Sequence, residues 1–348
     1  MVRRIFIMLG NACNISCRYC VQHPLIKRPL DKEIDQALYS YLDEQFNKNK
    51  HLRVTFYGGE PLIYFPTIKS IVTTKPFLKG RAGIISNGKA LSDEMVDFIN
   101  KWDMTLTISW DGKESAKTRK FNVMEQPEIR HRLMRVNKLC LSGVLSSCNS
   151  LIGLLNDFNN FNKIYFGINE KNISINVDPI FDTGLADKRL INVDYEKVRE
   201  EIRYLYNLFI KKDFSNYCYT NYIYQLLHRM KKHIDNINER NNRECSCSNG
   251  YSVMNVDLKG NLYQCHNTSE IFGHVSDTDI SSYVRKIVNA DVTEERRKTI
   301  CQNCQAKLLC DGGCKLVPDE NLKEYCRLRK AIYGTLFECV TVIRGDIC

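Results

Sequence analysis

The sequence contains no apolar run of the roughly 20 residues that a membrane-spanning helix needs. Prolines are few, eight in 348 residues, and there is no low-complexity tract. The basic N-terminal residues precede only five apolar residues, Ile5–Leu9, and no small-residue cleavage site follows, so a secretory signal is also missing. These absences predict a globular, cytoplasmic protein with no membrane partner.

A dense basic segment is missing as well, although the formal net charge is +10. Lysines and arginines are scattered along the chain and are not gathered with interleaved aromatic residues, as they would be in a nucleic-acid-binding surface. We therefore predict no nucleic-acid partner. With 348 residues the chain is long enough for one large barrel-like domain with an appendage, or for two ordinary domains.

Cysteine, in contrast, is abundant. Of sixteen cysteines, three lie within residues 13–20, two at 245 and 247, one at 265 and five within residues 301–326. Disulfide-rich secreted proteins are usually small and carry a signal sequence, whereas this chain is long and has none. The clustering therefore predicts metal binding. Five cysteines have no ligand-like spacing: Cys140, Cys148, Cys218, Cys339 and Cys348.

Short β-branched or aromatic runs alternate with helix-like segments in the first half of the chain. About six repeats of this alternation predict a parallel sheet with right-handed crossovers. The predicted fold class is α/β, a partial (β/α)6, TIM-like barrel followed by a small cysteine-rich domain. The expected strands are Val2–Leu9, Leu52–Tyr57, Gly83–Ser86, Met104–Trp110, Leu141–Ser147 and Ile173–Val177, and the expected helices include 31–47, 92–102 and 128–140.

We place a domain boundary near residue 240. The first domain, 1–240, ends in two long polar helices over 193–240 that are broken near Lys212–Asn216. In the second domain, 241–348, short hairpin-like pieces, glycine turns and cysteines precede a final helix. Its apolar periods are short, so we expect bound inorganic groups to stabilise it.

The first cysteine group has the spacing Cys13-x3-Cys17-x2-Cys20 and follows the first expected strand. Active sites of parallel α/β proteins gather at the carboxyl ends of strands. An iron–sulfur cluster normally has four cysteine ligands, so three would leave one iron open for a small molecule. The alternative is a zinc site completed by a distant ligand such as His23.

This spacing, with an aromatic residue before the last cysteine, resembles the signature of the radical S-adenosylmethionine (SAM) superfamily. The resemblance implies that the amino and carboxylate groups of SAM bind the open iron, and that SAM is cleaved to a 5′-deoxyadenosyl radical. Motifs after the next three strands, 57–61, 86–88 and 109–112, also match the family, although each alone would be a plain turn. An arginine usually stands about a dozen residues past the serine of the last motif, and here it stands ten residues past. The residues that the resemblance assigns to SAM are Tyr19, Gly58, Gly59, Glu60, Pro61, Ser86, Asn87, Ser109, Asp111 and Arg119.

The later cysteines resemble the SPASM extension of one branch of this superfamily, which binds two auxiliary [4Fe–4S] clusters. The resemblance assigns Cys301, Cys304, Cys310 and Cys326 to the outer cluster and Cys247, Cys265 and Cys314 to the inner one. Either Cys245 completes the inner cluster or its fourth iron stays open. Three [4Fe–4S] clusters and SAM are therefore the expected cofactors. Zinc ribbons are the alternative, but they need paired Cys-x2-Cys knuckles and this region has one such pair.

Relatives with this extension mostly act on peptides, forming thioether or carbon–carbon crosslinks, and auxiliary clusters can accept the surplus electron of an oxidation. We predict a peptide-maturing oxidoreductase. The alternatives are maturation of a sulfatase by formylglycine formation, a small-molecule substrate, tRNA modification, or a non-catalytic electron carrier. Sulfatase-maturing relatives carry an aspartate after the cysteine of Gly-x4-Cys, where this chain has His266. We expect His266 to act as a base, as a hydrogen-bond donor to cluster sulfur, or as a satisfied histidine beside the site.

The expected partners are a precursor peptide and a reductant of the flavodoxin or ferredoxin type. Many peptide-crosslinking relatives have an N-terminal domain that binds the leader of the precursor. Because the first strand begins near residue 2, we expect either a separate leader-recognition protein or direct recognition by the barrel.

The ligand role of Cys245 can be tested by iron analysis. Cys245→Ala should lower the iron content and alter the spectrum of the inner cluster, because one iron loses its thiolate. Cys339→Ala is the matched control and should leave both unchanged. Unchanged iron and an intact inner-cluster spectrum in Cys245→Ala would exclude it as an essential ligand.

Overall fold

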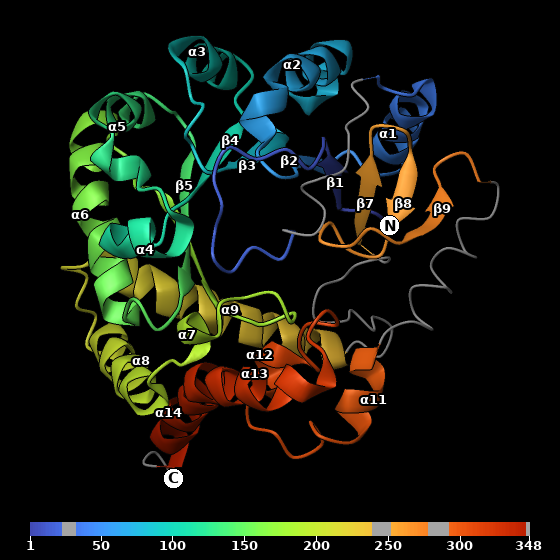
Figure 1. Ribbon diagram of the computed structural model, residues 1–348. Coiled ribbons are helices and arrows are strands. Elements are labelled where there is room, and N and C mark those ends of the chain that lie inside the picture. Colours follow the sequence, from blue (N-terminus) through green and yellow to red (C-terminus); the bar gives the residue numbers. More distant parts are fainter. Residues whose placement is uncertain (23–32, 239–251, 278–291, 346–348) are drawn as a thin grey trace.

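The computed structural model describes residues 1–22, 33–238, 252–277 and 292–345, and a nine-stranded sheet forms its centre (Figure 1). The strand order is β6-β5-β4-β3-β2-β1-β7-β8-β9. Strands β1 to β6 are all parallel to their neighbours, and β1 also pairs in parallel with β7. The strands are β1 Arg4–Met8, β2 Arg53–Tyr57, β3 Ala82–Ser86, β4 Thr105–Ser109, β5 Leu139–Leu145, β6 Ser174–Pro179, β7 Val253–Asp257, β8 Asn261–Tyr263 and β9 Ile271–His274.

The α/β prediction of an open, barrel-like parallel sheet is confirmed, and each of the six expected strands lies within two residues of an observed one. Helices cover the outer side of the curved sheet (Figure 1). The helices of this half are α1 Gln36–Lys48, α2 Phe65–Thr74, α3 Asp93–Lys101, α4 Ser115–Arg119, α5 Pro127–Met134, α6 Leu151–Asn169, α7 Lys188–Ile191, α8 Tyr195–Ile210 and α9 Tyr217–Asn238.

Alternation along β5 separates a helix-covered face from an inner face. Every second residue from Leu139 to Leu145 is buried, whereas Cys140, Ser142 and Val144 are partly exposed. A Cβ built on Gly143 would lie 3.0 Å from the ring of Phe158 in α6, so the buried face is the one beneath the helices. Burial of this apolar face stabilises the sheet, and the partly polar side chains are left to line the inside.

Two expected helices differ from the observed ones at their ends. The expected helix 128–140 is too long, because α5 ends at Met134 and β5 begins at Leu139. The Tyr165 hydroxyl donates to the Val136 carbonyl at 2.6 Å, so this carbonyl is held by α6 and does not continue a helix. The first helix begins at Gln36, where the Asp35 carboxylate caps it by accepting from the Ala37 N–H at 2.7 Å.

The two ends of the sheet are completed differently. At the β6 edge, Gln225 of α9 donates to the Ile175 carbonyl at 3.0 Å, which satisfies one exposed backbone group of an edge strand. At the other end, β7, β8 and β9 continue the sheet as antiparallel neighbours. The expected break between the two long helices is observed, with Lys212 in the left-handed region at φ 56°.

The C-terminal segment is helical and lies against α8 and α9 (Figure 1). Helix α12 contacts α9, and α14 contacts α8. In the part of the chain that the structure describes, no helix has the length and apolarity to cross a membrane. The elements are α11 Val292–Lys298, α12 Lys307–Cys310, α13 Leu322–Arg329, a π-helical turn Lys330–Gly334 and α14 Thr335–Gly345.

Two glycines after β2 allow the loops after β1 and β2 to touch. The Gly59 N–H donates to the Gly10 carbonyl and the Glu60 N–H to the Ala12 carbonyl, both at 2.8 Å. A Cβ on Gly59 would lie 2.4 Å from the Ala12 oxygen, and one on Gly58 would lie 2.2 Å from the Gly10 oxygen. Only glycine therefore permits this backbone contact, which fixes the start of the first cysteine loop.

Replacement of Gly59 tests this contact. Gly59→Ala should lower the free energy of unfolding by about 1–3 kcal/mol or more, because the added methyl group collides with backbone. The matched control is Gly167→Ala in α6, where nothing lies within 4 Å of the new Cβ. The free energies of unfolding of the two variants are to be measured in urea. Equal values for Gly59→Ala and Gly167→Ala would contradict the proposed collision.

Candidate functional site

The first cysteine loop, which contains Cys13, Cys17 and Cys20, follows the carboxyl end of β1. Burial raises the pKa of Cys17 to about 11 and also raises the pKa of Cys13, and both thiols lie within electrostatic reach of Cys20. Thiols with such pKa values stay protonated at neutral pH unless a metal ion binds the thiolate. Within the described residues, no three His, Cys, Asp or Glu side chains are arranged to hold a single metal ion. This set of soft donors fits a cluster, in which the thiolates bind different iron atoms.

Glu60 holds the loops after β2 and β3 together. It is buried, and its carboxylate accepts hydrogen bonds from the Ser86 hydroxyl at 2.6 Å, the Asn87 N–H at 2.8 Å and the Leu62 N–H at 2.9 Å. Burial raises the pKa of Glu60, and this effect is larger than the lowering caused by the three hydrogen bonds. Three of the residues expected to bind SAM are thus brought together, but the Glu60 carboxylate already has protein partners and acts as a support for the two loops.

The other parts of these two motifs reach the cysteine loop directly. The Asn87 amide donates to the Asn14 side chain at 2.9 Å and lies 3.8 Å from the Cys13 sulfur. Pro61 starts the short helix Pro61–Tyr64, whose last residue accepts a hydrogen bond from the Ala12 N–H through its hydroxyl at 3.1 Å.

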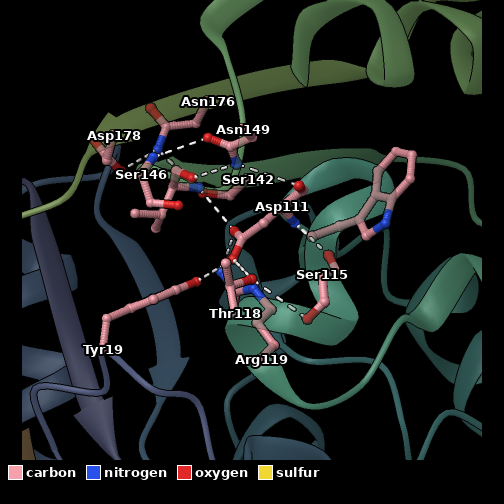
Figure 2. A network of polar contacts seen from close by, with 12 residues as sticks. Tyr19, Asp111, Ser115, Thr118, Arg119, Ser142, Ser146, Asn149, Asn176 and Asp178 are labelled. Carbon is pink, nitrogen blue, oxygen red and sulfur yellow. Dashed lines mark hydrogen bonds and ion pairs between the residues drawn. The ribbon is translucent and has the colours of Figure 1, made fainter. Parts of the chain in front are cut away.

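Asp111 is the centre of a second network (Figure 2). Its fully buried carboxylate accepts hydrogen bonds from the Tyr19 hydroxyl at 2.7 Å, the Thr118 hydroxyl at 2.6 Å and the Val144 N–H at 2.9 Å, and it pairs with the Arg119 guanidinium at 3.1 Å. These donors come from the cysteine loop, α4 and β5. The buried charge therefore connects three segments that are far apart in the sequence, and the Asp111 side chain has no free oxygen for a ligand.

Arg119 lies between this network and the cysteines. Its guanidinium stands 5.4 Å from the Tyr19 ring centroid. Burial would lower its pKa, but Asp111, Tyr19 and Cys17 outweigh this effect and the pKa is raised, so the side chain stays charged. Its Nε is buried without a hydrogen-bond partner in the described chain. A buried donor of this kind, close to Cys17, fits an anionic group such as a carboxylate.

A polar row on the inner face of the sheet was not predicted. Ser109 is the register partner of Ser142, and Ser142 is the partner of Asn176. The Asn176 amide donates to the Ser142 hydroxyl at 3.2 Å and to Asp178 at 2.5 Å, and Figure 2 shows this group beside Asp111. Only Ser109 had a sequence signal. The period-2 alternation of β5 and β6 could have indicated the other residues, but only once the pairing register was known.

The segment around Cys265 comes close to the first cysteine loop. The Gln22 side chain donates to the His266 carbonyl at 3.0 Å, and Tyr57 lies within electrostatic reach of both Cys20 and Cys265. The His266 ring is half-buried and stacks at 4.6 Å on Phe6, and loss of solvation lowers its pKa to about 4. A neutral ring held in this way favours the satisfied-histidine role. The base role stays a prediction.

Four cysteines of the outer group lie together. Burial raises the pKa of Cys310 to about 12, and its thiol is within electrostatic reach of Cys326, Cys301 and Cys304. Cys314 packs with Cys310 and Cys326 against Val317, Leu322 and Tyr325. Cys245 and Cys247 lie outside the described residues, as does His23, so the inner ligand set stays a prediction.

Comparison with known proteins gave sequence relatives. A family model described as a 4Fe-4S single cluster domain matches residues 2–128. The chain is 24% identical over 350 residues to the radical SAM cyclopropyl synthase TigE of Paramaledivibacter caminithermalis, with 90% of this chain and 68% of that protein covered. It is 30% identical over 117 residues to an uncharacterized protein of Methanothermobacter thermautotrophicus, with 32% of this chain and 44% of that protein covered.

Solved structures show the same fold. Native anSMEcpe with bound AdoMet matches with a TM-score of 0.66 and 16% identity, covering 100% of both chains. Streptococcus suis SuiB bound to the precursor peptide SuiA matches with a TM-score of 0.60 and 16% identity, covering 91% of this chain and 72% of that one. At these identities the likeness concerns the fold alone.

The buried Asp111 network can be tested by removing its charge. Asp111→Asn should lower the free energy of unfolding by roughly 3–5 kcal/mol, because Arg119 is left as an uncompensated buried charge. The matched control is Asp97→Asn, whose ion pair with Arg135 is largely exposed and should contribute under about 1 kcal/mol.

A double variant separates the ion pair from simple loss of packing. Asp111→Asn combined with Arg119→Met should be less destabilised than the sum of the two single variants, as measured by urea unfolding. Strict additivity would show that the two side chains do not interact.

Proposed function

We propose that this chain, which belongs to the radical SAM family of enzymes, oxidatively modifies a ribosomally synthesised peptide. The observation that supports this most is the convergence of the Cys13–Cys20 loop, Arg119 and the polar row from Ser109 to Asp178 at one end of the sheet. An enzyme of this kind needs a cluster, a SAM site and a substrate surface next to one another.

Cys13, Cys17 and Cys20 would hold the first [4Fe–4S] cluster, and the open iron would bind SAM. Together, the cluster and SAM supply a radical able to abstract hydrogen from an unactivated carbon. Arg119 would bind the SAM carboxylate through its unpartnered Nε and its charge, while Asp111 holds the guanidinium in position. The Gly58–Glu60 backbone and Asn87 position the cysteine loop through the contacts described above.

The inner face of the sheet supports a peptide substrate. Ser142, Asn176 and Asp178 offer hydroxyl, amide and carboxylate groups in a row, which is a suitable pairing surface for the polar backbone of an extended peptide. Two proteins of the same fold are seen with peptides, SuiB with its precursor peptide SuiA and anSMEcpe with the Cp18Cys peptide.

The expected chemistry is bond formation with loss of hydrogen. Cys301, Cys304, Cys310 and Cys326 would hold an outer auxiliary cluster, and Cys265 and Cys314 would contribute to an inner one that accepts the electron left on the substrate. The sequence relative is named a cyclopropyl synthase, and a cyclopropyl ring is closed by a carbon–carbon bond. We therefore favour carbon–carbon bond formation over a thioether.

The function is tested by reconstituting the chain anaerobically with iron and sulfide and adding dithionite and SAM. We expect 5′-deoxyadenosine to form. Any short open reading frame found beside the gene should be co-expressed with the enzyme, and its peptide should become lighter by two hydrogen atoms for each bond formed, as measured by mass spectrometry. The variant with Ala at Cys13, Cys17 and Cys20 is the control, and it should produce neither product.

The outcomes separate the candidate functions. An absence of 5′-deoxyadenosine from fully loaded wild-type protein contradicts radical chemistry. Formation of 5′-deoxyadenosine with formylglycine in a co-expressed sulfatase, and no change in the peptide, contradicts peptide maturation and supports the sulfatase alternative.

A further inference from the structure

Arg329, the last residue of α13, is a buried cation that has no carboxylate partner among the described residues. Its side chain is 8% exposed, and no ion pair joins it to an acidic side chain in the described parts of the chain. Its guanidinium donates to the Pro179 carbonyl at 3.2 Å and stacks 4.4 Å from the centroid of the Tyr325 ring. Both partners are uncharged, so the positive charge is not balanced by them.

Arg296, another buried arginine of the C-terminal segment, does have an acidic partner. It is equally buried, but it pairs with the Asp319 carboxylate at 3.0 Å and also donates to the Val317 and Cys314 carbonyls. An unpaired buried charge is strongly unfavourable, and it persists in folded proteins when an anion or a metal centre balances it. Arg329 therefore needs an anion that the acidic side chains of the described residues do not supply.

The outer cysteine group is next to it. Burial lowers the pKa of Arg329, but Tyr325, Tyr333 and Cys310 outweigh burial and raise it. Tyr325 provides the physical connection, because its ring stacks on Arg329, its hydroxyl accepts a hydrogen bond from the Cys314 N–H at 3.0 Å, and it packs with Cys310 and Cys326.

We propose that Arg329 is the counter-charge of the outer auxiliary cluster and holds its reduction potential at a more positive value. The inference rests on the proposed assignment of Cys301, Cys304, Cys310 and Cys326 to that cluster. A cluster bound by four thiolates is an anion, and it gains one further negative charge when it accepts one electron. A fixed buried cation stabilises the reduced form more than the oxidised form, so it favours electron uptake by the outer cluster.

The experiment is a redox titration of the reconstituted full-length chain, followed by electron paramagnetic resonance without peptide. The outer-cluster signal is identified as the one lost in Cys301→Ala and Cys326→Ala. In Arg329→Met, which removes the charge at similar length, we expect a more negative midpoint potential for this signal alone. Arg329→Lys should restore it toward the wild-type value. Arg327→Met is the matched control, because Arg327 lies on the same helix but is exposed and paired with Glu324, so its loss should leave the potential unchanged.

Each outcome decides the proposal. A negative shift in Arg329→Met with recovery in Arg329→Lys supports it, as does loss of outer-cluster iron in Arg329→Met with retention in Arg329→Lys. An unchanged potential in Arg329→Met, an equal shift in Arg327→Met, or loss of the outer cluster in both Arg329 variants overturns it. A wild-type chain without a signal that depends on Cys301 and Cys326 also overturns it. The redox titration contains no peptide, so its outcome does not depend on whether the enzyme modifies one. A failed peptide assay therefore does not contradict the role of Arg329, and a failed titration does not contradict peptide modification.

Discussion

The candidate site depends on a buried ion pair between Asp111 and Arg119. The Asp111 carboxylate is fully buried. Burial of its charge is favourable enough only because it pairs with the Arg119 guanidinium and accepts hydrogen bonds from three further donors. Because those donors belong to the cysteine loop, α4 and β5, one charge fixes the relative positions of the first three thiols and the inner polar row. It also holds Arg119 beside Cys17 with one donor to spare. The Asp111 carboxylate and the Arg119 guanidinium thus stabilise the fold and also position the group proposed to bind the ligand.

An arginine with little solvent exposure lies near each of the two cysteine groups, Arg119 near the first and Arg329 near the outer one, and each supplies a positive charge there. Arg119 has a carboxylate partner and still has an unpartnered Nε, which suits a ligand that carries its own carboxylate. Arg329 has no acidic partner in the part of the chain that the structure describes, which suits a cluster whose charge comes from thiolates. In both cases the cysteine thiols have raised pKa values because of burial. The protein surroundings therefore favour thiolates only together with iron and a nearby cation.

Much of the fold could be predicted from the sequence because its signals are local. Each strand of the parallel sheet is a short apolar run, and the cysteine spacings and strand-end motifs are contiguous, so both could be recognised without knowledge of the pairing. The end of α5 could not, since it depends on a hydrogen bond from Tyr165 to Val136 across 29 residues. The Ser142–Asn176–Asp178 row depends on strand register, and the setting of Arg329 depends on its contact with Pro179, 150 residues away. The motif residue Glu60 was expected to bind SAM, but the sequence could not show that Ser86 and Asn87 already occupy its carboxylate.

The central claim is that the iron left free by Cys13, Cys17 and Cys20 binds SAM, with Arg119 facing its carboxylate. The most direct measurement is the electron paramagnetic resonance spectrum of the reduced chain as SAM is added, for the signal that disappears when these three cysteines are replaced. The account predicts that this signal changes shape with saturable dependence on SAM, and that Arg119→Met needs a higher SAM concentration for the same change. A signal that SAM does not alter at any concentration would contradict the account.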